Sequence, residues 1–163
     1  MKISTSSIEL NTGIAKDKRE KICIGLSSVL ADSYYLMIKT HNYHWNVKGL
    51  NFRQIHLLTE EQYTELFGAI DNIAERIRAL GFNAPGSVKE FDKLTSIKQG
   101  DGNLSAEEML EDLLESHENL IRTARKALPA AADVSDEATV DLLTHRLDVH
   151  EKTAWMLRSM LEK

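Results

Sequence analysis

The sequence predicts an all-α protein, a four-helix bundle in which one long connection crosses from one end of the bundle to the other. Apolar residues recur at helical spacing in four long stretches, whereas β-branched residues do not alternate with polar ones as they do in strands. Only two prolines occur, and neither interrupts a long apolar-periodic run. At 163 residues the chain can bury a core without disulfides, so we expect residues 1–163 to form one domain.

The first two expected helices form a hairpin that follows a short N-terminal tail of about 14 residues. The first helix runs to about Asn46, and Gly49 then breaks it. Asn51 and Gln54 have the spacing of a capping box and open the second helix, which Gly81 ends. The apolar stripe of the first helix is Ile22, Leu26, Val29, Leu30 and Met37, and that of the second is Leu66, Ile70, Ile73, Ile77 and Leu80.

The connection after the second helix is long and rich in glycine and proline. It contains the stretch SVKEFDKLTSI, which we expect to form one or two helical turns. Ser105 and Glu108 form a capping box that opens the third helix, which we expect to end near Pro129. Ser135 opens the fourth helix, which runs to the C-terminus. Two short links and one long one describe ferritin-like connectivity.

The composition argues against several classes of protein. The formal net charge of -5 would multiply in a homo-oligomer and repel nucleic acid phosphates. The single cysteine, Cys23, lies among apolar residues, so we expect a buried thiol without a function. The N-terminus lacks a basic segment followed by an apolar one, and nowhere do about 18 apolar residues run together. We therefore expect a cytoplasmic protein without a membrane span.

A second face of the second expected helix carries acidic residues and a histidine. On a helical wheel of about 100° per residue, this face lies roughly 80 to 180° from the apolar stripe. Apolar residues share this side, whereas an ordinary solvated face would carry pairs of Lys and Glu. The polar members of the face are His56, Glu60, Asp71 and Glu75.

The spacing of these residues predicts a site shared by two chains. His56 and Glu60 are spaced i, i+4, which directs two ligand atoms at one point, and Asp71 and Glu75 have the same spacing. The two pairs are about 16 Å apart along the axis, too far for one metal. If the helix packs antiparallel against its copy across a two-fold axis, each pair faces the other pair of the partner subunit. His44 joins them, because the hairpin should bring it close to His56.

Two interpretations of this constellation remain open at this stage. Carboxylates with some imidazole and no thiolate suit Fe(II), Fe(III), Mn or Zn. Equally, the same residues can form a set of satisfied hydrogen bonds at a subunit interface.

The segment from His44 to Arg76 resembles the Dps family of mini-ferritins. The string HWN begins at His44, a second histidine follows twelve residues later, and the pattern E-x10-D-x3-E-R runs from Glu60 to Arg76. The resemblance implies that each diiron ferroxidase centre takes His44, His56 and Glu60 from one subunit and Asp71 and Glu75 from its two-fold mate. Glu60 stands where the best-known members have Asp, a longer side chain that keeps the charge and can alter metal spacing.

The resemblance also implies what the protein does. It implies a homododecameric shell that oxidises Fe(II), preferably with hydrogen peroxide rather than dioxygen, and stores the ferric product inside. Each centre would take two iron ions, with Zn or Mn as possible substitutes. Trp45 is similar to the family's tryptophan beside the centre, although packing explains it equally well. Asp141 is similar in context to the acidic residue of the family's three-fold pores, or is simply a solvated carboxylate, and Glu61 is a candidate for nucleating mineral.

Several residues stay outside the predicted site. We expect them to be packed or surface residues: Tyr43, Tyr63, His117, His145 and His150. DNA binding is the alternative function, but it needs a Lys-rich arm, and this chain has only Lys2 before Lys16 and Lys18. A purely structural four-helix module is the third interpretation.

Overall fold

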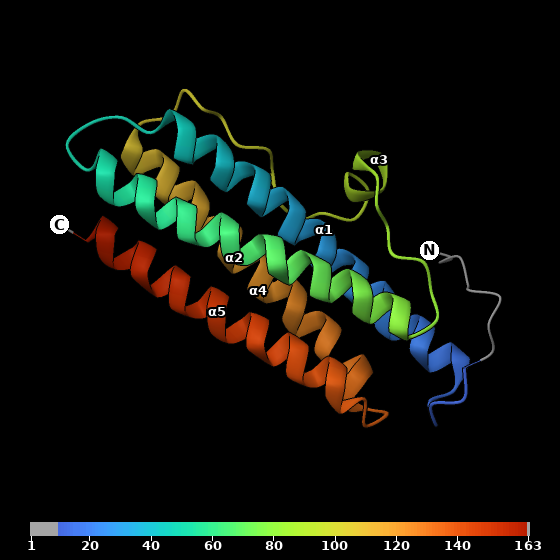
Figure 1. The fold of residues 1–163 in the computed structure, drawn as a ribbon. Coiled ribbons are helices and arrows are strands. Elements are labelled where there is room, and N and C mark those ends of the chain that lie inside the picture. Colours follow the sequence, from blue (N-terminus) through green and yellow to red (C-terminus); the bar gives the residue numbers. More distant parts are fainter. Residues whose placement is uncertain (1–9, 163) are drawn as a thin grey trace.

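The computed structural model describes residues 10–162 and confirms the all-α fold class. Four long helices form the bundle, and one short helix lies in the crossover (Figure 1). The helices are α1 (Lys16–Asn46), α2 (Phe52–Ala79), α3 (Val88–Phe91), α4 (Ala106–Ala132) and α5 (Glu137–Leu161). Of the predicted N-terminal tail, residues 1–9 lie outside the described part of the chain, and residues 10–14 precede α1 without forming a helix.

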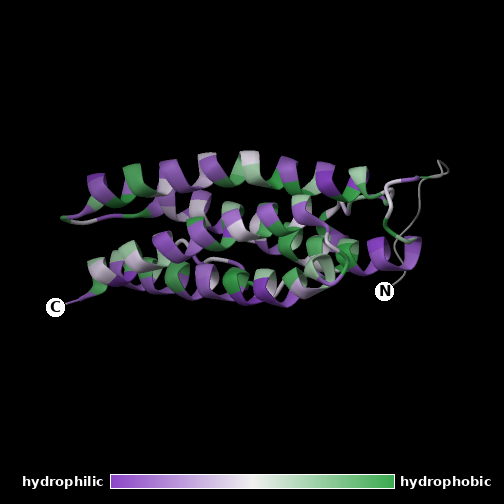
Figure 2. Ribbon diagram, turned by 90° about the horizontal axis from the view of Figure 1, so that it is seen from below, coloured by the Kyte–Doolittle hydropathy of each residue, from purple (hydrophilic) through white to green (hydrophobic). Residues whose placement is uncertain are grey.

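The bundle consists of two helical hairpins joined through their inner helices. α1 packs against α2 and α4, and α4 also packs against α5. Hydrophilic and hydrophobic residues follow one another along each long helix (Figure 2). The buried apolar residues of all four long helices form one core. The predicted stripe of the second helix is buried, as are residues of every other long helix, among them Leu26, Leu30, Leu113, Leu120 and Leu143.

Glycines shape both ends of α2. Gly49, in the link between α1 and α2, has φ +106°, and Gly81, just after α2, has φ +90°. Residues with a Cβ rarely adopt this left-handed region, so glycine allows the chain to turn sharply there. The predicted ends of the first hairpin therefore agree with the structure.

The predicted capping was right at one helix and wrong at two. Ser105 and Glu108 form the expected capping box of α4. Asn51 is the N-cap of α2 but makes no capping bond, because its backbone (φ -96°, ψ 14°) is not in the β region that capping requires. At α5 the N-cap is Asp136, whose side chain accepts from the Thr139 N–H, and Ser135 lies one residue earlier with φ +55°.

We expected the third helix to end near Pro129, and α4 continues past this proline to Ala132. Proline lacks an N–H and so removes one helical hydrogen bond, but its own carbonyl can still accept. The Pro129 carbonyl accepts from the Asp133 N–H at 2.9 Å, which closes one further turn.

The crossover is anchored to α1 by Asp32, which is fully buried. Its carboxylate accepts hydrogen bonds from the Thr95 hydroxyl, the Ser96 hydroxyl and the Ser96 N–H, at 2.6 to 2.9 Å. Nearer to α3, the rings of Tyr34 and Phe91 stack with centroids 4.5 Å apart. The predicted short helix in the crossover is α3, and it is held against α1 by these contacts.

By length and composition alone, α1 could cross a membrane. In the structure 56% of its most apolar window is buried inside the bundle. A core helix of a four-helix bundle has the same properties, and α1 is the helix that packs against both α2 and α4.

Cys23 is predicted to make the folded protein less stable at alkaline pH. The thiol is fully buried and lies 3.9 Å from the Ile77 carbonyl, and burial raises its pKa from 9.0 to about 12. Above pH 9 the unfolded chain therefore loses a proton that the folded chain keeps, and stability falls as pH rises. Between pH 9 and about 12, deprotonation of Cys23 in the unfolded chain should shift the equilibrium toward unfolding about tenfold per pH unit.

Urea unfolding of the Cys23→Ala variant below and above pH 9 measures this effect. We expect the variant to lose less stability than the parent protein across that interval. Tyr43, whose pKa is raised by burial and by its hydrogen bond to Asp112, should account for part of the remaining slope. An identical slope in the variant and the parent would contradict the prediction.

Candidate metal centre

The α1–α2 hairpin holds His44 and His56 against each other. Their rings are stacked, with centroids 3.8 Å apart and planes 16° from parallel. His44 Nδ1 lies 2.8 Å from the His56 carbonyl oxygen, and His56 Nδ1 lies 2.9 Å from the His44 carbonyl oxygen. The expected proximity of these two residues is confirmed.

These two hydrogen bonds determine which ring nitrogens are free. A carbonyl oxygen only accepts, so each Nδ1 carries a proton and donates it. In the neutral imidazole the lone pair then lies on Nε2, which is the atom left to bind a metal. His44 is 8% exposed and His56 is half-buried, so the hairpin presents two oriented imidazole rings close to the surface.

The three predicted carboxylates lie on α2 and are exposed in the single chain. Glu60 is one turn beyond His56, whereas Asp71 is about 16 Å farther along the axis than Glu60. Among residues 10–162, no three His, Cys, Asp or Glu side chains are grouped so that they could hold a metal ion. One chain therefore assembles the two imidazoles and leaves Glu60, Asp71 and Glu75 at its surface.

Large apolar side chains lie on the same face of α2 as these carboxylates. Leu57 and Phe67 fall within the sector roughly 100 to 180° from the core stripe on a helical wheel. Phe67 is 72% exposed and Leu57 is also exposed. Apolar side chains of this size interleaved with carboxylates are typical of a surface that another protein surface covers.

Two arginines fix α2 relative to α5. Arg76 donates from Nε to the Thr139 hydroxyl at 2.8 Å and forms an ion pair with the buried Asp136. Arg146, on α5, is itself buried and binds both carboxylate oxygens of Glu65. These pairs determine how α2 is rotated about its axis, and therefore where its carboxylate face points.

An aromatic cluster surrounds the histidine pair. Trp45 is 69% exposed and stacks on His41, with ring centroids 5.0 Å apart. The His41 ring lies 3.9 Å from that of Tyr63, which in turn meets His44 edge-on at 5.2 Å. Burial lowers the pKa of His41, and the neighbouring His44 lowers it further.

His41 and Tyr63 were not among the predicted site residues. His41 lies three residues before His44 and four before Trp45, so helical spacing alone would have placed it on this side of α1. The position of Tyr63 depends on how α1 and α2 align side by side, which the sequence pattern does not specify.

Among the described residues, the others singled out from the sequence take no part in these ring contacts. Glu61, Asp141 and His145 are exposed, on α2 and α5. Tyr43 is fully buried and donates to Asp112, and His117 and His150 meet in the interior of the bundle. The expectation that these histidines are packed or exposed is confirmed.

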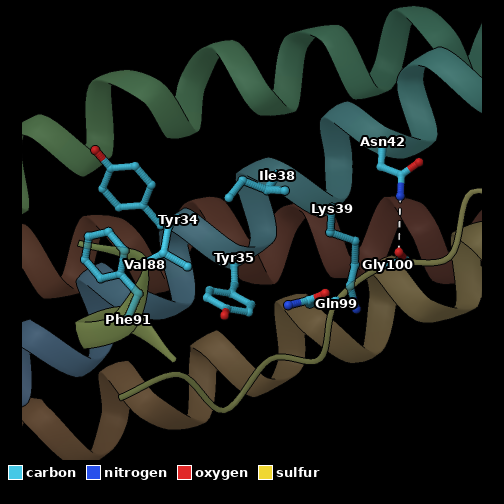
Figure 3. Close-up of a pocket in the computed structure, with 9 residues that line it drawn as sticks. All are labelled: Tyr34, Tyr35, Ile38, Lys39, Asn42, Val88, Phe91, Gln99 and Gly100. Carbon is cyan, nitrogen blue, oxygen red and sulfur yellow. Dashed lines mark hydrogen bonds between the residues drawn. The ribbon is translucent and has the colours of Figure 1, made fainter. Parts of the chain in front are cut away.

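A separate cavity of about 300 Å³ lies between α1, α3 and the crossover (Figure 3). It is lined mainly by aromatic and aliphatic side chains, including Tyr34, Tyr35 and Phe91. Asn42 closes one end by donating to the Gly100 carbonyl at 3.1 Å. None of the five predicted metal ligands lines this cavity.

Comparison with known proteins identifies the family. Residues 25–163 match the family model of the ferritin-like domain. Over 138 residues the chain is 38% identical to DNA protection during starvation protein 2 of Bacillus anthracis, covering 85% of this chain and 94% of that protein. The chain belongs to the Dps family of ferritin-like proteins. The family resemblance seen in the sequence is thereby confirmed.

Two further matches extend over nearly the whole chain. A low-temperature-induced protein of Nostoc is 42% identical over 155 residues, covering 94% of this chain and 87% of that protein. The Dps protein of Vibrio cholerae O1, described as a member of the ferritin-like diiron-carboxylate proteins, has a TM-score of 0.90 and 28% identity, covering 97% of this chain and 100% of that one.

Proposed function

We propose that this Dps-family protein is an iron-storing mini-ferritin of the cytoplasm that oxidises Fe(II) at centres shared by two-fold related subunits. The observation that carries the proposal is the His44–His56 pair, whose reciprocal Nδ1 bonds leave two Nε2 atoms free beside the Glu60 turn of α2. Packing alone does not require two histidines to be oriented in this way, whereas metal ligation does.

Each centre takes His44, His56 and Glu60 from one subunit, with Asp71 and Glu75 supplied by its two-fold mate. The exposed face of α2 supports this arrangement, because its carboxylates are interleaved with Leu57 and Phe67. An antiparallel α2–α2 contact buries those apolar side chains and brings each acidic pair to the histidines of the other chain.

Fe(II) is the substrate that this ligand set suits best. Carboxylate oxygens with imidazole nitrogens bind both Fe(II) and Fe(III), and Zn or Mn can compete for the same ligands. Two Fe(II) ions give two electrons to one hydrogen peroxide molecule, which takes up two protons and becomes two water molecules. Because both electrons leave together, no hydroxyl radical is released, and dioxygen is the weaker alternative oxidant.

Trp45 serves in this proposal as a sink for stray oxidising equivalents. Its ring is linked to His44 through His41 and Tyr63 by ring contacts of 3.9 to 5.2 Å. On the inner side of the shell, Glu61 binds ferric product and Asp141 lines an entry pore, both as exposed carboxylates.

The test combines assembly and activity. We expect light scattering to give the mass of twelve chains of 18.4 kDa, and anaerobic Fe(II)-loaded protein to form ferric product when peroxide is added. His56→Ala should slow this oxidation at least about tenfold. His145→Ala, which removes an exposed histidine of α5, is the matched control and should oxidise iron normally. A monomer or plain dimer, or equal rates in the two variants, would refute the proposal.

DNA binding is expected to be weak or absent. Each chain carries a net charge of -5, Lys16 and Lys18 are part of α1, and Lys2 lies outside the described residues. Binding to DNA needs several cations that reach phosphates together, which an acidic shell does not provide. Gel-shift assays at neutral pH over a range of salt concentrations measure this, and plasmid retention at physiological salt would show the expectation to be wrong.

A further inference from the structure

The rings of His117 and His150 join α4 to α5 in the interior of the bundle, where these two helices pack side by side (Figure 1). Their Nδ1 atoms lie 3.0 Å apart, and their ring centroids 5.2 Å. His117 is 2% exposed and His150 is 1% exposed. In a bond between two ring nitrogens one ring donates and the other accepts. The bond therefore exists only while at least one of the two rings is neutral.

The outer nitrogens of the two rings lie in a dry environment. Among the described residues, Nε2 of His117 and Nε2 of His150 are buried without a hydrogen bond, as are both polar atoms of the Gln62 side chain on α2. The residues of α4 one turn before and after His117 are apolar: Leu113, Leu114, Leu120 and Ile121. A proton added to this pair therefore places a charge where water does not solvate it, which is unfavourable.

The charged groups around the pair do not offset that cost. The charged residues that line the neighbouring cavity of about 310 Å³ are Glu61, Glu65, Asp148 and Lys152. Glu65 is paired with the buried Arg146, and the other three are exposed at the surface. On the α1 side, Lys39 is paired with Asp112 and donates to Ser116, the neighbour of His117 in sequence. Carboxylates near the pair are thus either already paired or in contact with solvent.

Burial keeps both rings neutral in the closed bundle. It lowers the pKa of His117 to about 3, and burial together with the facing His117 and with Arg146 lowers the pKa of His150 well below 6.5. Once the helices separate, water reaches both rings and their pKa returns toward the ordinary value of 6.5. The open state then binds more protons than the closed state. The stability of the closed state is therefore full above pH 6.5 and falls as pH decreases below it.

We propose that the His117–His150 pair is an acid-sensitive latch, which holds α4 and α5 together while it is neutral and releases them when acid charges both rings. Two imidazolium rings cannot share the Nδ1–Nδ1 bond, and their charges repel each other. The cavity beside the pair gives water a route to the rings as the helices part. Neither histidine belongs to the proposed diiron centre, so the latch does not depend on iron oxidation.

Hydrogen exchange of the assembled full-length protein, read by mass spectrometry, measures the opening of each segment after correction for the intrinsic pH dependence of exchange. Residues 113–121 and 146–154 contain the latch, and residues 22–31 of α1 serve as the reference segment. Between about pH 5.5 and 4.5 we expect the opening of the latch segments to increase up to about a hundredfold, one factor of ten for each histidine. The reference segment should change much less.

The double variant His117→Gln with His150→Gln keeps polar side chains at both positions but removes both titrating groups. It should lose most of the acid-dependent opening, whereas His145→Gln, which removes an exposed histidine of α5, should keep it. Equal increases in the latch and reference segments of the parent protein would overturn the proposal, as would an unchanged increase in the double variant. If the double variant does not fold, the comparison of the two segments in the parent protein decides.

Discussion

Shells assembled from equal amounts of His56→Ala and Asp71→Ala chains are expected to recover about a quarter of the wild-type active sites, although each variant alone is nearly inactive. Half of the dimers formed by random pairing contain one chain of each kind. In such a dimer one site carries both lesions, and the other takes intact ligands from both chains. Initial rates of peroxide-dependent Fe(II) oxidation measure the recovery, with co-assembly verified by mass spectrometry.

A mixture of His44→Ala and His56→Ala chains provides the matched control. Both lesions lie on the histidine side of the centre, so every site in every dimer keeps one of them, and no activity should return. If each centre lay within one chain, both mixtures would behave like this control. If activity returns in neither mixture, the shared site is contradicted, whether or not the protein binds iron.

The Asp112→Ala substitution is expected to destabilise the protein by about 3 kcal/mol. Lys39 is buried, with 1% of its side chain exposed, and its ammonium group lies 2.8 Å from Asp112. Removal of the carboxylate leaves that charge without a counterion and also removes the acceptor of the buried Tyr43 hydroxyl. Because Asp112 itself is partly exposed, the expected loss is at the lower end of the range for buried pairs.

Thermal and urea unfolding at a fixed protein concentration measure this loss, since assembly also contributes to stability. Glu111→Ala, the exposed neighbour on α4, should change stability by no more than about 0.5 kcal/mol. A double substitution, Lys39→Met with Asp112→Leu, should recover much of the loss because it removes both charges. Equal stability of Asp112→Ala and Glu111→Ala would contradict the prediction.

The fold could be predicted from the sequence because the helical period is strong and local. The apolar stripe of α2 and the capping box at Ser105 depend on residues within a few positions of one another. The errors occurred at helix ends, where small energies compete. The backbone of Asn51 lies outside the β region that capping requires. Beyond Pro129 the helix continues for one more turn, although proline lacks an N–H.

The candidate site was only partly predictable, for a different reason. A hairpin with a short link determines which residues pass each other, so the meeting of His44 and His56 could be expected. The orientation of their rings depends on backbone carbonyls, and the contact of Tyr63 with His41 depends on side-by-side alignment. His117 and His150 are 33 residues apart on separate helices, and no spacing rule predicts that their rings meet.

The reciprocal bonds between His44 and His56 have a consequence for the order of folding. Both partners belong to one hairpin with a short link, and contacts between residues near in sequence form with the smallest loss of chain entropy. The docking of α1 on α4 and the anchoring of the crossover by Asp32 join more distant segments and should come later. We therefore expect the histidine pair to be aligned while the rest of the bundle is still forming, so that a nascent subunit already carries the histidine half of the proposed metal centre before it meets a partner.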